Sequence, residues 1–220
     1  MNAISSSGQE IRDYYFQAYE NTDPSEQQWT TATAAPELVE LVRSGALPQG
    51  GSVLDIGCGV GSESVYLAGA GFDVTAVDIA PRAVERGRAL AEVYGYTVDW
   101  HVADVLELPF EDRQFDAVTD RGCFHCLRAP ERARFAEGIA RVLRPNGLYV
   151  LRCVSSQRLG QLEADAASHF VRTFGVSSTD LWEAFGSQFQ VEHMELGSAA
   201  PDKDAATPYG WYCLWRRRAE

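Results

Sequence analysis

Short runs of continuous apolar residues alternate, from Val53 onward, with segments in which apolar residues recur every three or four positions. Continuous runs are typical of strands buried on both faces, and the wider spacing predicts amphipathic helices. We therefore expect strands over 53–56, 72–77, 97–102, 115–119 and 148–154, and helices over 37–43, 63–70, 81–94 and 130–143. Strands and helices that alternate in this way form a parallel sheet covered on both faces.

The two ends of the chain depart from this alternation. Residues 8–20 place an isoleucine and three tyrosines at helical spacing, which predicts an amphipathic helix before the sheet. Residues 156–186 have the pattern of two helices divided near Gly175. The apolar patterns over 188–196 and 209–216 predict two further strands, and the loop between them is too short for a crossover helix. These two strands are therefore expected to pair antiparallel.

Length and charge limit the class of protein. A chain of 220 residues suits one sizeable domain. Its net charge of −12 argues against a nucleic-acid partner, which requires clustered Lys and Arg, and favours a small-molecule substrate. No apolar run approaches the ~18 residues of a membrane span, and residues 1–10 lack the features of a secretory signal. These absences predict a cytoplasmic protein that does not act at a membrane.

A glycine-rich turn follows the first predicted strand. Asp55 precedes Gly57, Gly59 and Gly61 at alternate positions, and helical spacing resumes directly afterwards. A strand that turns through glycines into a helix presents backbone N–H groups and the positive end of the helix to a ligand. The third glycine comes one residue too early for the G-x-G-x-x-G fingerprint of nicotinamide enzymes. The motif Asp-x-Gly-x-Gly-x-Gly instead resembles the first motif of the class I S-adenosylmethionine-dependent methyltransferases.

The resemblance to this family covers residues 36–216, because five parallel strands followed by an antiparallel hairpin are its architecture. It implies a Rossmann-like α/β fold with a mostly parallel seven-stranded sheet, an antiparallel C-terminal hairpin strand and helices on both faces. We divide the single domain into an N-terminal helix and lid segment, a cofactor-binding core, a substrate-cover insertion and a C-terminal strand hairpin, with the bounds 1–35, 36–154, 155–187 and 188–220.

Carboxylates stand at the ends of the predicted strands, where open α/β sheets bind ligands. The resemblance implies that Asp78 accepts hydrogen bonds from both ribose hydroxyls of S-adenosylmethionine, and that Asp104 and the Val105 backbone lie near the adenine. It also implies that Asp55 orders the glycine loop or meets the methionyl ammonium, and that Trp29 lies against the cofactor. The other expected cofactor-binding residues are Gly57, Cys58, Gly59, Gly61, Ile79 and Asp120. The alternative for each carboxylate is the cap of a helix.

The segment after the fourth predicted strand is where this family meets the methyl acceptor. Asp120-Arg121-Gly122 resembles thiopurine and related small-molecule S-methyltransferases, in which the Arg contacts the substrate or its water. Asp120, Arg121 and His125 are therefore expected to be catalytic. The expected substrate contacts are Tyr14, Tyr15, Arg121, Cys123 and His125. An ion pair of Arg121 with Asp120 or Asp104, and a packing role for His125, are the alternatives.

The acceptor atom decides which side chain would act. A thiol with a pKa near ~8.5 needs only a cationic neighbour such as Arg121 to ionise further. An alcohol or phenol needs a general base, for which His125 is the candidate. We predict a thiol acceptor, with an oxygen or nitrogen atom as the alternative. A partner subunit that binds the cofactor without chemistry would keep the same cofactor residues.

The cysteines indicate free thiols rather than a disulfide framework, since their number, five, is odd and their positions are scattered. Cys123 and Cys126 have the spacing of a metal or redox pair, but no second Cys or His pair at zinc-ligand spacing accompanies them. No metal is therefore predicted. The sequence does not distinguish a monomer from a homodimer.

Overall fold

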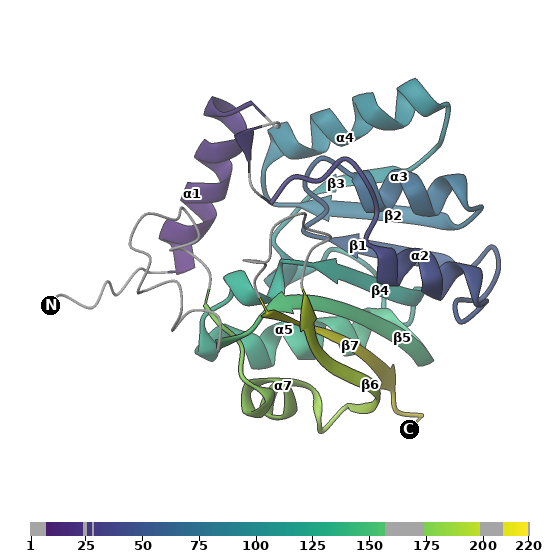
Figure 1. Ribbon diagram of the computed structural model, residues 1–220, viewed down its shortest axis with the longest axis vertical. Coiled ribbons are helices and arrows are strands. Elements are labelled where there is room, and N and C mark those ends of the chain that lie inside the picture. Colours follow the sequence, from purple (N-terminus) through teal and green to yellow (C-terminus); the bar gives the residue numbers. More distant parts are fainter. Residues whose placement is uncertain (1–7, 24–25, 28, 157–173, 199–208, 220) are drawn as a thin grey trace, which may run out of the picture.

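A computed structural model describes residues 8–23, 26–27, 29–156, 174–198 and 209–219. Seven strands of this part form one sheet in the order β3-β2-β1-β4-β5-β7-β6 (Figure 1). Their bounds are β1 (Ser52–Ile56), β2 (Asp73–Asp78), β3 (Asp99–Val102), β4 (Phe115–Arg121), β5 (Leu143–Val154), β6 (Phe189–Ser198) and β7 (Tyr209–Arg217). Strands β1 to β5 pair in parallel, and β7 pairs antiparallel with β5 and β6. The predicted fold is therefore confirmed.

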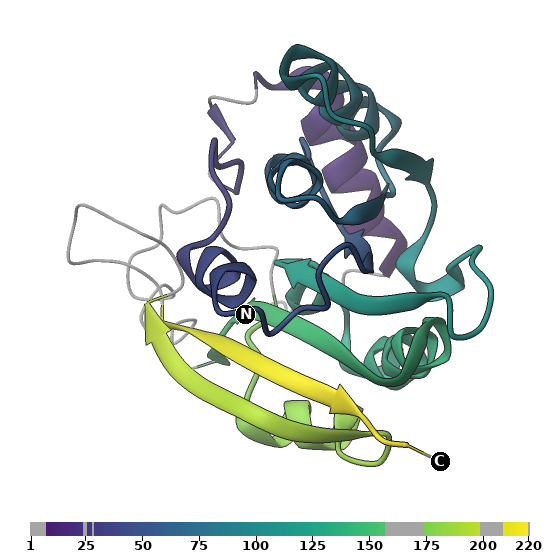
Figure 2. The same ribbon diagram turned by 90° about the vertical axis from the view of Figure 1, so that its right-hand side faces the viewer.

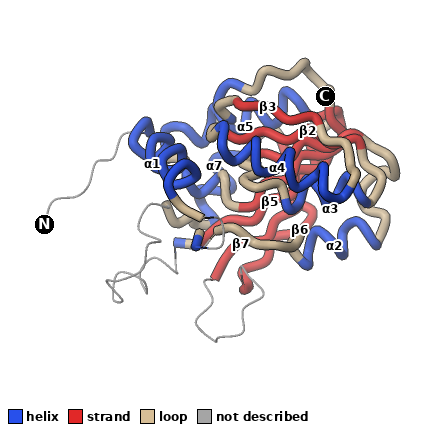
Figure 3. Tube along the Cα trace, turned by 90° about the horizontal axis from the view of Figure 1, so that it is seen from above, coloured by secondary structure: helices blue, strands red, loops and turns tan. Residues whose placement is uncertain are grey.

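Helices cover both faces of the sheet (Figure 2). One face carries α2 (Pro36–Arg43), α3 (Ser62–Gly69) and α4 (Pro81–Tyr94), and the other carries α5 (Ala129–Val142) and α7 (Ser178–Phe185). Successive side chains of a strand point to opposite faces. Val53 accordingly packs with α2 and α3, whereas Leu54 and Ile56 pack with α5 and α7. Helix α1 (Gly8–Asn21) lies apart from these layers, at one end of the sheet (Figure 3).

Local residue choice explains where several helices begin and end. Pro36 and Pro81 occupy the first turns of α2 and α4, where a missing N–H costs no hydrogen bond. Gly95 ends α4 in the left-handed conformation with φ 71°, which a glycine adopts without steric cost. The helices expected over 37–43 and 81–94 agree with these bounds to within one residue.

Strand β5 differs from its predicted start. It begins at Leu143 because Phe115 pairs with Leu143 before the register shifts to Ala117 and Leu148. The inserted residues include Asn146, whose φ is 64°, so they form a bulge within the strand rather than a turn ahead of it. Of the two helices predicted over 156–186, the second corresponds to α7, and most of the first lies outside the described residues.

The third glycine of the motif faces the interior of the fold. Gly61 has φ 80°, and a Cβ built there would lie 2.4 Å from Cη2 of Trp100. A Cβ on Gly87 of α4 would approach the same ring, at 2.4 Å from Cζ3. The indole therefore packs against the backbone at the start of α3 and against that of α4. This close approach explains the glycine at position 61 without reference to a ligand.

We expect Gly61→Ala to lower the free energy of unfolding by about 3 kcal/mol, because it combines a left-handed φ with overpacking against Trp100. Gly95→Ala is the matched control, since Gly95 has φ 71° but a Cβ added to it would have no atom within 4 Å. It should cost only about 1 kcal/mol. Urea denaturation measures both changes, and equal effects would contradict the packing role of Gly61.

Candidate functional site

A cavity of about 300 Å³ lies at the carboxyl ends of strands β1 to β5, the edge at which open α/β sheets bind ligands. Helix α1 crosses this edge, so its tyrosines form one wall (Figure 1). The predicted site residues that line the cavity are Tyr14, Tyr15, Trp29, Asp55, Gly57, Cys58, Gly59, Asp78, Ile79, Asp104, Val105, Arg121, Cys123 and His125. Gly61 and Asp120 were also predicted, but they lie behind the wall.

The glycine loop is held to the end of β2 by Asp78. One carboxylate oxygen of Asp78 accepts a hydrogen bond from the Gly59 N–H at 2.9 Å, and the other accepts one from the Ala80 N–H at 2.9 Å. Burial raises the pKa of Asp78, whereas these backbone donors lower it. Each oxygen has room for a second donor, because a carboxylate oxygen offers two lone pairs. The arrangement suits a ligand with two neighbouring hydroxyl groups.

Asp55 lies beneath the glycine loop and is 3 % exposed. Its two oxygens accept hydrogen bonds from the Ser64 hydroxyl at 2.5 Å and from the Thr119 hydroxyl at 3.2 Å. Burial, followed by the nearby carboxylate of Glu63, raises the pKa of Asp55 to about 7. These contacts tie β1 to α3 and β4, which supports the loop-ordering role among the two roles expected for Asp55.

Four aromatic side chains meet at the α1 side of the cavity. The rings of Tyr14, Tyr15 and Tyr19 each lie edge-on to Trp29, with centroid distances of 6.2, 5.4 and 6.2 Å. The Trp29 indole N–H donates to the Tyr19 hydroxyl at 3.1 Å. That hydroxyl would lie 2.7 Å from a Cβ on Gly59, so it rests against the glycine loop. The predicted site omits Tyr19, although its place one helical turn after Tyr15 puts both residues on one face.

Arg12 is a second residue of α1 that the predicted site omits. Its guanidinium lies 3.2 Å from the second oxygen of Asp104 and 3.5 Å from Glu131 of α5. The first oxygen of Asp104 accepts the Leu106 N–H at 2.9 Å and so caps the short helix η2 (Val105–Glu107). Asp104 is therefore a helix cap that also faces the cavity. Helical spacing from Tyr15 and Tyr19 is the signal that places Arg12 at this wall.

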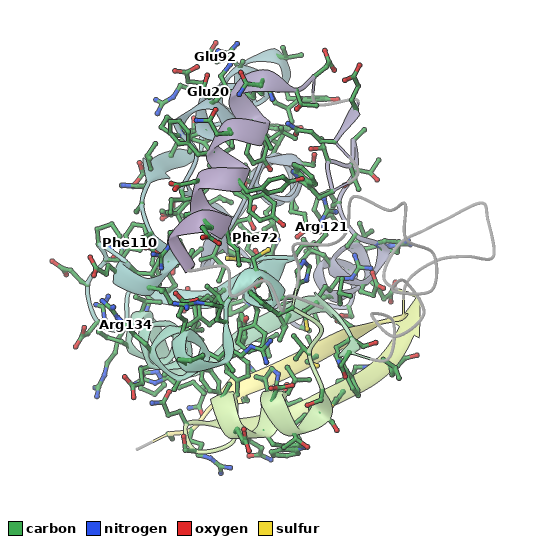
Figure 4. The ribbon with its side chains drawn as sticks, turned by 90° about the vertical axis from the view of Figure 1, so that its left-hand side faces the viewer. Glu20, Phe72, Glu92, Phe110, Arg121 and Arg134 are labelled. Atoms are coloured by element: carbon green, nitrogen blue, oxygen red, sulfur yellow. The ribbon has the colours of Figure 1, made fainter. Side chains whose placement is uncertain are left out.

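Arg121, which is labelled in Figure 4, lies at the end of β4 and contacts the segment that precedes α2. Its guanidinium donates to the Thr33 carbonyl at 3.0 Å and to the Thr31 hydroxyl. It also pairs with Glu63 of α3, at 3.1 Å. The alternative stated for Arg121, an ion pair with Asp120 or Asp104, is therefore wrong, because the partner of Arg121 is Glu63. Glu63 was missed because nothing in its local sequence distinguishes it from a solvated acidic residue in the first turn of a helix.

Asp120 organises the turn after β4 from behind the cavity wall. It is 2 % exposed, and its carboxylate accepts the N–H groups of Cys123 and Phe124 at 2.8 and 3.1 Å. The Tyr149 hydroxyl donates to it at 3.0 Å. Burial raises the pKa of Asp120 to about 7. These three donors hold the short helix η3 (Phe124–Cys126), so the contacts support an indirect role in place of the expected catalytic and cofactor contacts.

His125 is in the cavity wall, but its ring is already engaged. Its Nδ1 accepts the Val154 N–H at 3.1 Å, which leaves the proton of the neutral ring on Nε2. Burial, and then the charge of Arg132, lower the pKa of His125 from 6.5 to about 4. The imidazole is therefore a hydrogen-bond donor toward the cavity at neutral pH. This geometry disfavours the predicted general base.

The lowered pKa of His125 makes stability depend on pH. Between pH 6.5 and about 4 the unfolded chain binds a proton at this residue that the folded chain does not, so stability falls as the pH falls through this window. We expect the unfolding free energy of the wild type to drop by about 3 kcal/mol relative to that of His125→Asn, whose amide oxygen can accept the same N–H. Urea denaturation at a series of pH values measures this difference. Parallel pH profiles would contradict it.

The cysteines near the cavity are thiols in apolar surroundings. Cys126 Sγ lies 3.2 Å from the Tyr15 hydroxyl oxygen and 3.2 Å from the Gly122 carbonyl oxygen. Burial raises the pKa of Cys126 to about 12 and that of Cys123 well above its ordinary value. Neither thiol is therefore activated.

The described residues contain no cluster of three or more His, Cys, Asp or Glu side chains that could hold a metal ion. Within the same residues, no helix has the length and apolar character that a membrane crossing needs.

Comparison with known proteins finds a family whose model matches part of this chain. The methyltransferase domain family matches residues 53–147. A 2-heptyl-1-hydroxyquinolin-4(1H)-one methyltransferase of Mycobacteroides abscessus is 27% identical over 146 residues, which are 64% of this chain and 63% of that protein. A ubiquinone biosynthesis O-methyltransferase of Xanthomonas axonopodis pv. citri is 37% identical over 114 residues, which are 51% of this chain and 46% of that protein. The chain thus spans less than two thirds of the length of these curated relatives.

A solved structure shares the fold over almost the whole chain. It comes from work on the conversion of a disulfide bond into a thioacetal group during echinomycin biosynthesis. It superposes with a TM-score of 0.81 at 23% identity and covers 94% of this chain and 92% of that chain. The family match includes the glycine loop, Asp78 and Asp104, which line the cavity. Residues 53–147 therefore match the methyltransferase domain family, and the chain shares the fold of solved methyltransferase structures.

Proposed function

We propose that the protein binds S-adenosylmethionine and transfers its methyl group to a small molecule, with a thiol sulfur as the acceptor atom. One observation carries the choice of acceptor. Each carboxylate and imidazole that the structure describes in the cavity wall already accepts a hydrogen bond or faces an arginine. A substrate that must be deprotonated by the enzyme would have to use a group that already makes such a contact. A thiol ionises in part without one.

The residues of the cavity fit the cofactor. Asp78 has two oxygens for a pair of ribose hydroxyls. A side chain at Gly59 would fill the space between the glycine loop and the Tyr19 hydroxyl. The described wall has five carboxylates, from Asp55, Glu63, Asp78, Asp104 and Glu131, against three guanidinium groups, from Arg12, Arg121 and Arg152. This excess of negative charge suits a ligand that carries a sulfonium and an ammonium. The four rings at α1 present further faces that attract cations.

S-adenosylmethionine supplies an activated methyl group, whose bond to the sulfonium sulfur breaks as the bond to the acceptor sulfur forms. The task of the chain is to hold the acceptor in line and within about 3 Å, which is catalysis by proximity. The aromatic residues of α1 and Trp29 exclude water from this space. The acceptor reaches the thiolate form by its own ionisation, a few per cent at neutral pH for an ordinary thiol. The rate should therefore rise with pH toward the pKa of the acceptor and show no step from His125.

A panel of matched acceptors tests the proposal. Thiophenol, phenol and aniline share one ring and differ in the acceptor atom. A fourth acceptor, 4-nitrophenol, has the hydroxyl of phenol made acidic enough to ionise without help from a base. Isothermal titration should first show binding of S-adenosylmethionine and S-adenosylhomocysteine, but not of NAD. We then expect kcat/KM for phenol to be at least about 100-fold below that for thiophenol, since the phenol lacks base assistance. Mass spectrometry of the methylated products measures both rates.

Each other result has a distinct meaning. Rapid methylation of 4-nitrophenol together with slow methylation of thiophenol would show that the acceptor is an acidic hydroxyl and not a thiol. Faster methylation of phenol or aniline than of thiophenol would overturn the argument from the missing base. Binding of the cofactor without formation of S-adenosylhomocysteine from any acceptor would favour a binding protein without chemistry. Failure to bind either sulfur nucleoside would reject the methyltransferase assignment.

A further inference from the structure

We propose that Arg121 is a positioning residue, which fastens the segment 29–35 over the cofactor cavity, rather than a residue that contacts the methyl acceptor. The proposal rests on the function given above, because the cavity is taken as the cofactor site. It concerns a segment that lies between α1 and α2 and carries Trp29. This segment has no regular secondary structure to hold it, so its position depends on side-chain contacts.

The contacts of Arg121 reach this segment at two places. One guanidinium nitrogen, Nη1, donates to the Thr33 carbonyl at 3.0 Å, and the other, Nη2, donates to the Thr31 hydroxyl. The planar fork of an arginine presents spaced donors to such diverging acceptors, whereas a lysine presents all its donors from one nitrogen atom. Arg121 itself is fixed at the end of β4, whose register with β1 and β5 is regular there. The segment is thereby tied to the centre of the sheet.

Helix α3 supplies the second attachment of the same segment. Glu63 pairs with Arg121 at 3.1 Å, and its same oxygen accepts the Ala35 N–H at 3.0 Å. The Ser62 hydroxyl donates to the Thr31 carbonyl at 2.5 Å. Glu63 is 6 % exposed, so its charge needs the arginine as a partner. Removal of Arg121 would therefore leave the segment attached only through α3 and would take the paired guanidinium away from the buried Glu63 carboxylate.

Trp29 connects this network to the ligand site. Its indole N–H donates to Tyr19, whose hydroxyl rests against Gly59 of the glycine loop. A looser segment would displace Trp29 and with it the aromatic wall of the cavity. The loss should appear as weaker cofactor binding, since these rings lie beside the glycine loop and Asp78. Acceptor binding, once the cofactor is saturating, should change little.

The experiment compares Arg121→Gln and Arg121→Lys with the wild type. We expect Arg121→Gln to raise the dissociation constant for S-adenosylmethionine about tenfold, which corresponds to two or three lost hydrogen bonds, and Arg121→Lys to restore part of it. With saturating cofactor, KM for thiophenol should stay within about twofold, which is below the effect of a single lost hydrogen bond. Hydrogen exchange of peptides that cover 29–35 should become faster in Arg121→Gln, while peptides from α5 serve as an internal reference.

Arg141→Gln is the matched control. Arg141 also clamps a loop, through the carbonyls of Phe110 and Leu108 and through Asp112, but it does not line the cavity. This variant should accelerate exchange around 108–112 and leave cofactor binding unchanged. An unchanged cofactor affinity with a tenfold higher acceptor KM in Arg121→Gln would overturn the proposal and assign the residue to the acceptor. If the wild type binds no cofactor, the proposed function fails. If hydrogen exchange over 29–35 is unchanged in Arg121→Gln, the fastening role is rejected, whatever the outcome for the proposed function.

Discussion

Asp78→Ala is expected to raise the dissociation constant for S-adenosylmethionine by more than about 100-fold, the largest effect of any substitution in the cavity wall. In the proposed complex the carboxylate accepts two charge-assisted hydrogen bonds from ribose hydroxyls, and each such bond contributes about 1.5–3 kcal/mol. The alanine also frees the N–H groups of Gly59 and Ala80, which Asp78 now holds. Isothermal titration with S-adenosylmethionine and S-adenosylhomocysteine measures the loss.

Asp73→Ala is the matched control for this measurement. Asp73 begins the same strand, β2, at the opposite end from the cavity, and its side chain is exposed. This variant removes the same charge and should leave both affinities unchanged within about twofold, as is usual for surface substitutions. If Asp78→Ala binds both nucleosides with wild-type affinity, the cofactor does not use this carboxylate, and its ribose must lie elsewhere.

Asp120→Asn is expected to have the largest effect on stability, a loss of about 4 kcal/mol in the free energy of unfolding. All three groups that face the carboxylate are donors: the N–H groups of Cys123 and Phe124 and the Tyr149 hydroxyl. Asparagine has an NH2 group in place of one carboxylate oxygen, and this group faces at least one of the three donors. That buried donor therefore loses its acceptor. The short helix η3 and the cavity wall that it carries should loosen with it. Chemical denaturation gives the loss, and hydrogen exchange locates it.

Tyr149→Phe separates the contribution of one donor from that of the network. It removes a single hydrogen bond to Asp120 without introducing a wrong donor, so we expect a loss of only about 1–1.5 kcal/mol. A double variant with Asp120→Asn should lose less than the sum of the two, because the residues share one network. Strict additivity would show that the tyrosine and the aspartate act independently. A catalytic role of Asp120 without a structural one would leave the stability of Asp120→Asn close to that of the wild type.

The sequence determined the fold and most of the side of the cavity where we propose that the cofactor binds. Both follow from short-range patterns. Continuous apolar runs separated by amphipathic segments admit little besides a covered parallel sheet. The glycine turn, Asp78 and Asp104 each stand directly after a strand, so the topology alone brings them to one edge. The bulge before Leu148 could not be predicted from the sequence, because the pair Asn146-Gly147 is typical of a turn between two elements.

Only the tertiary structure decided what the polar residues on the acceptor side do. Arg121 and Glu63 are distant in the sequence, and each has several acidic or basic residues at similar distance along the chain. Which of them pair depends on how α3, β4 and the segment 29–35 pack together. His125 has a suitable pKa for a base in water, but the fold half-buries its ring, and its Nδ1 accepts the Val154 N–H. Local pattern thus specified the backbone of the proposed cofactor site, whereas burial and hydrogen-bond partners, which are set by long-range packing, specified the chemistry of the side chains around it.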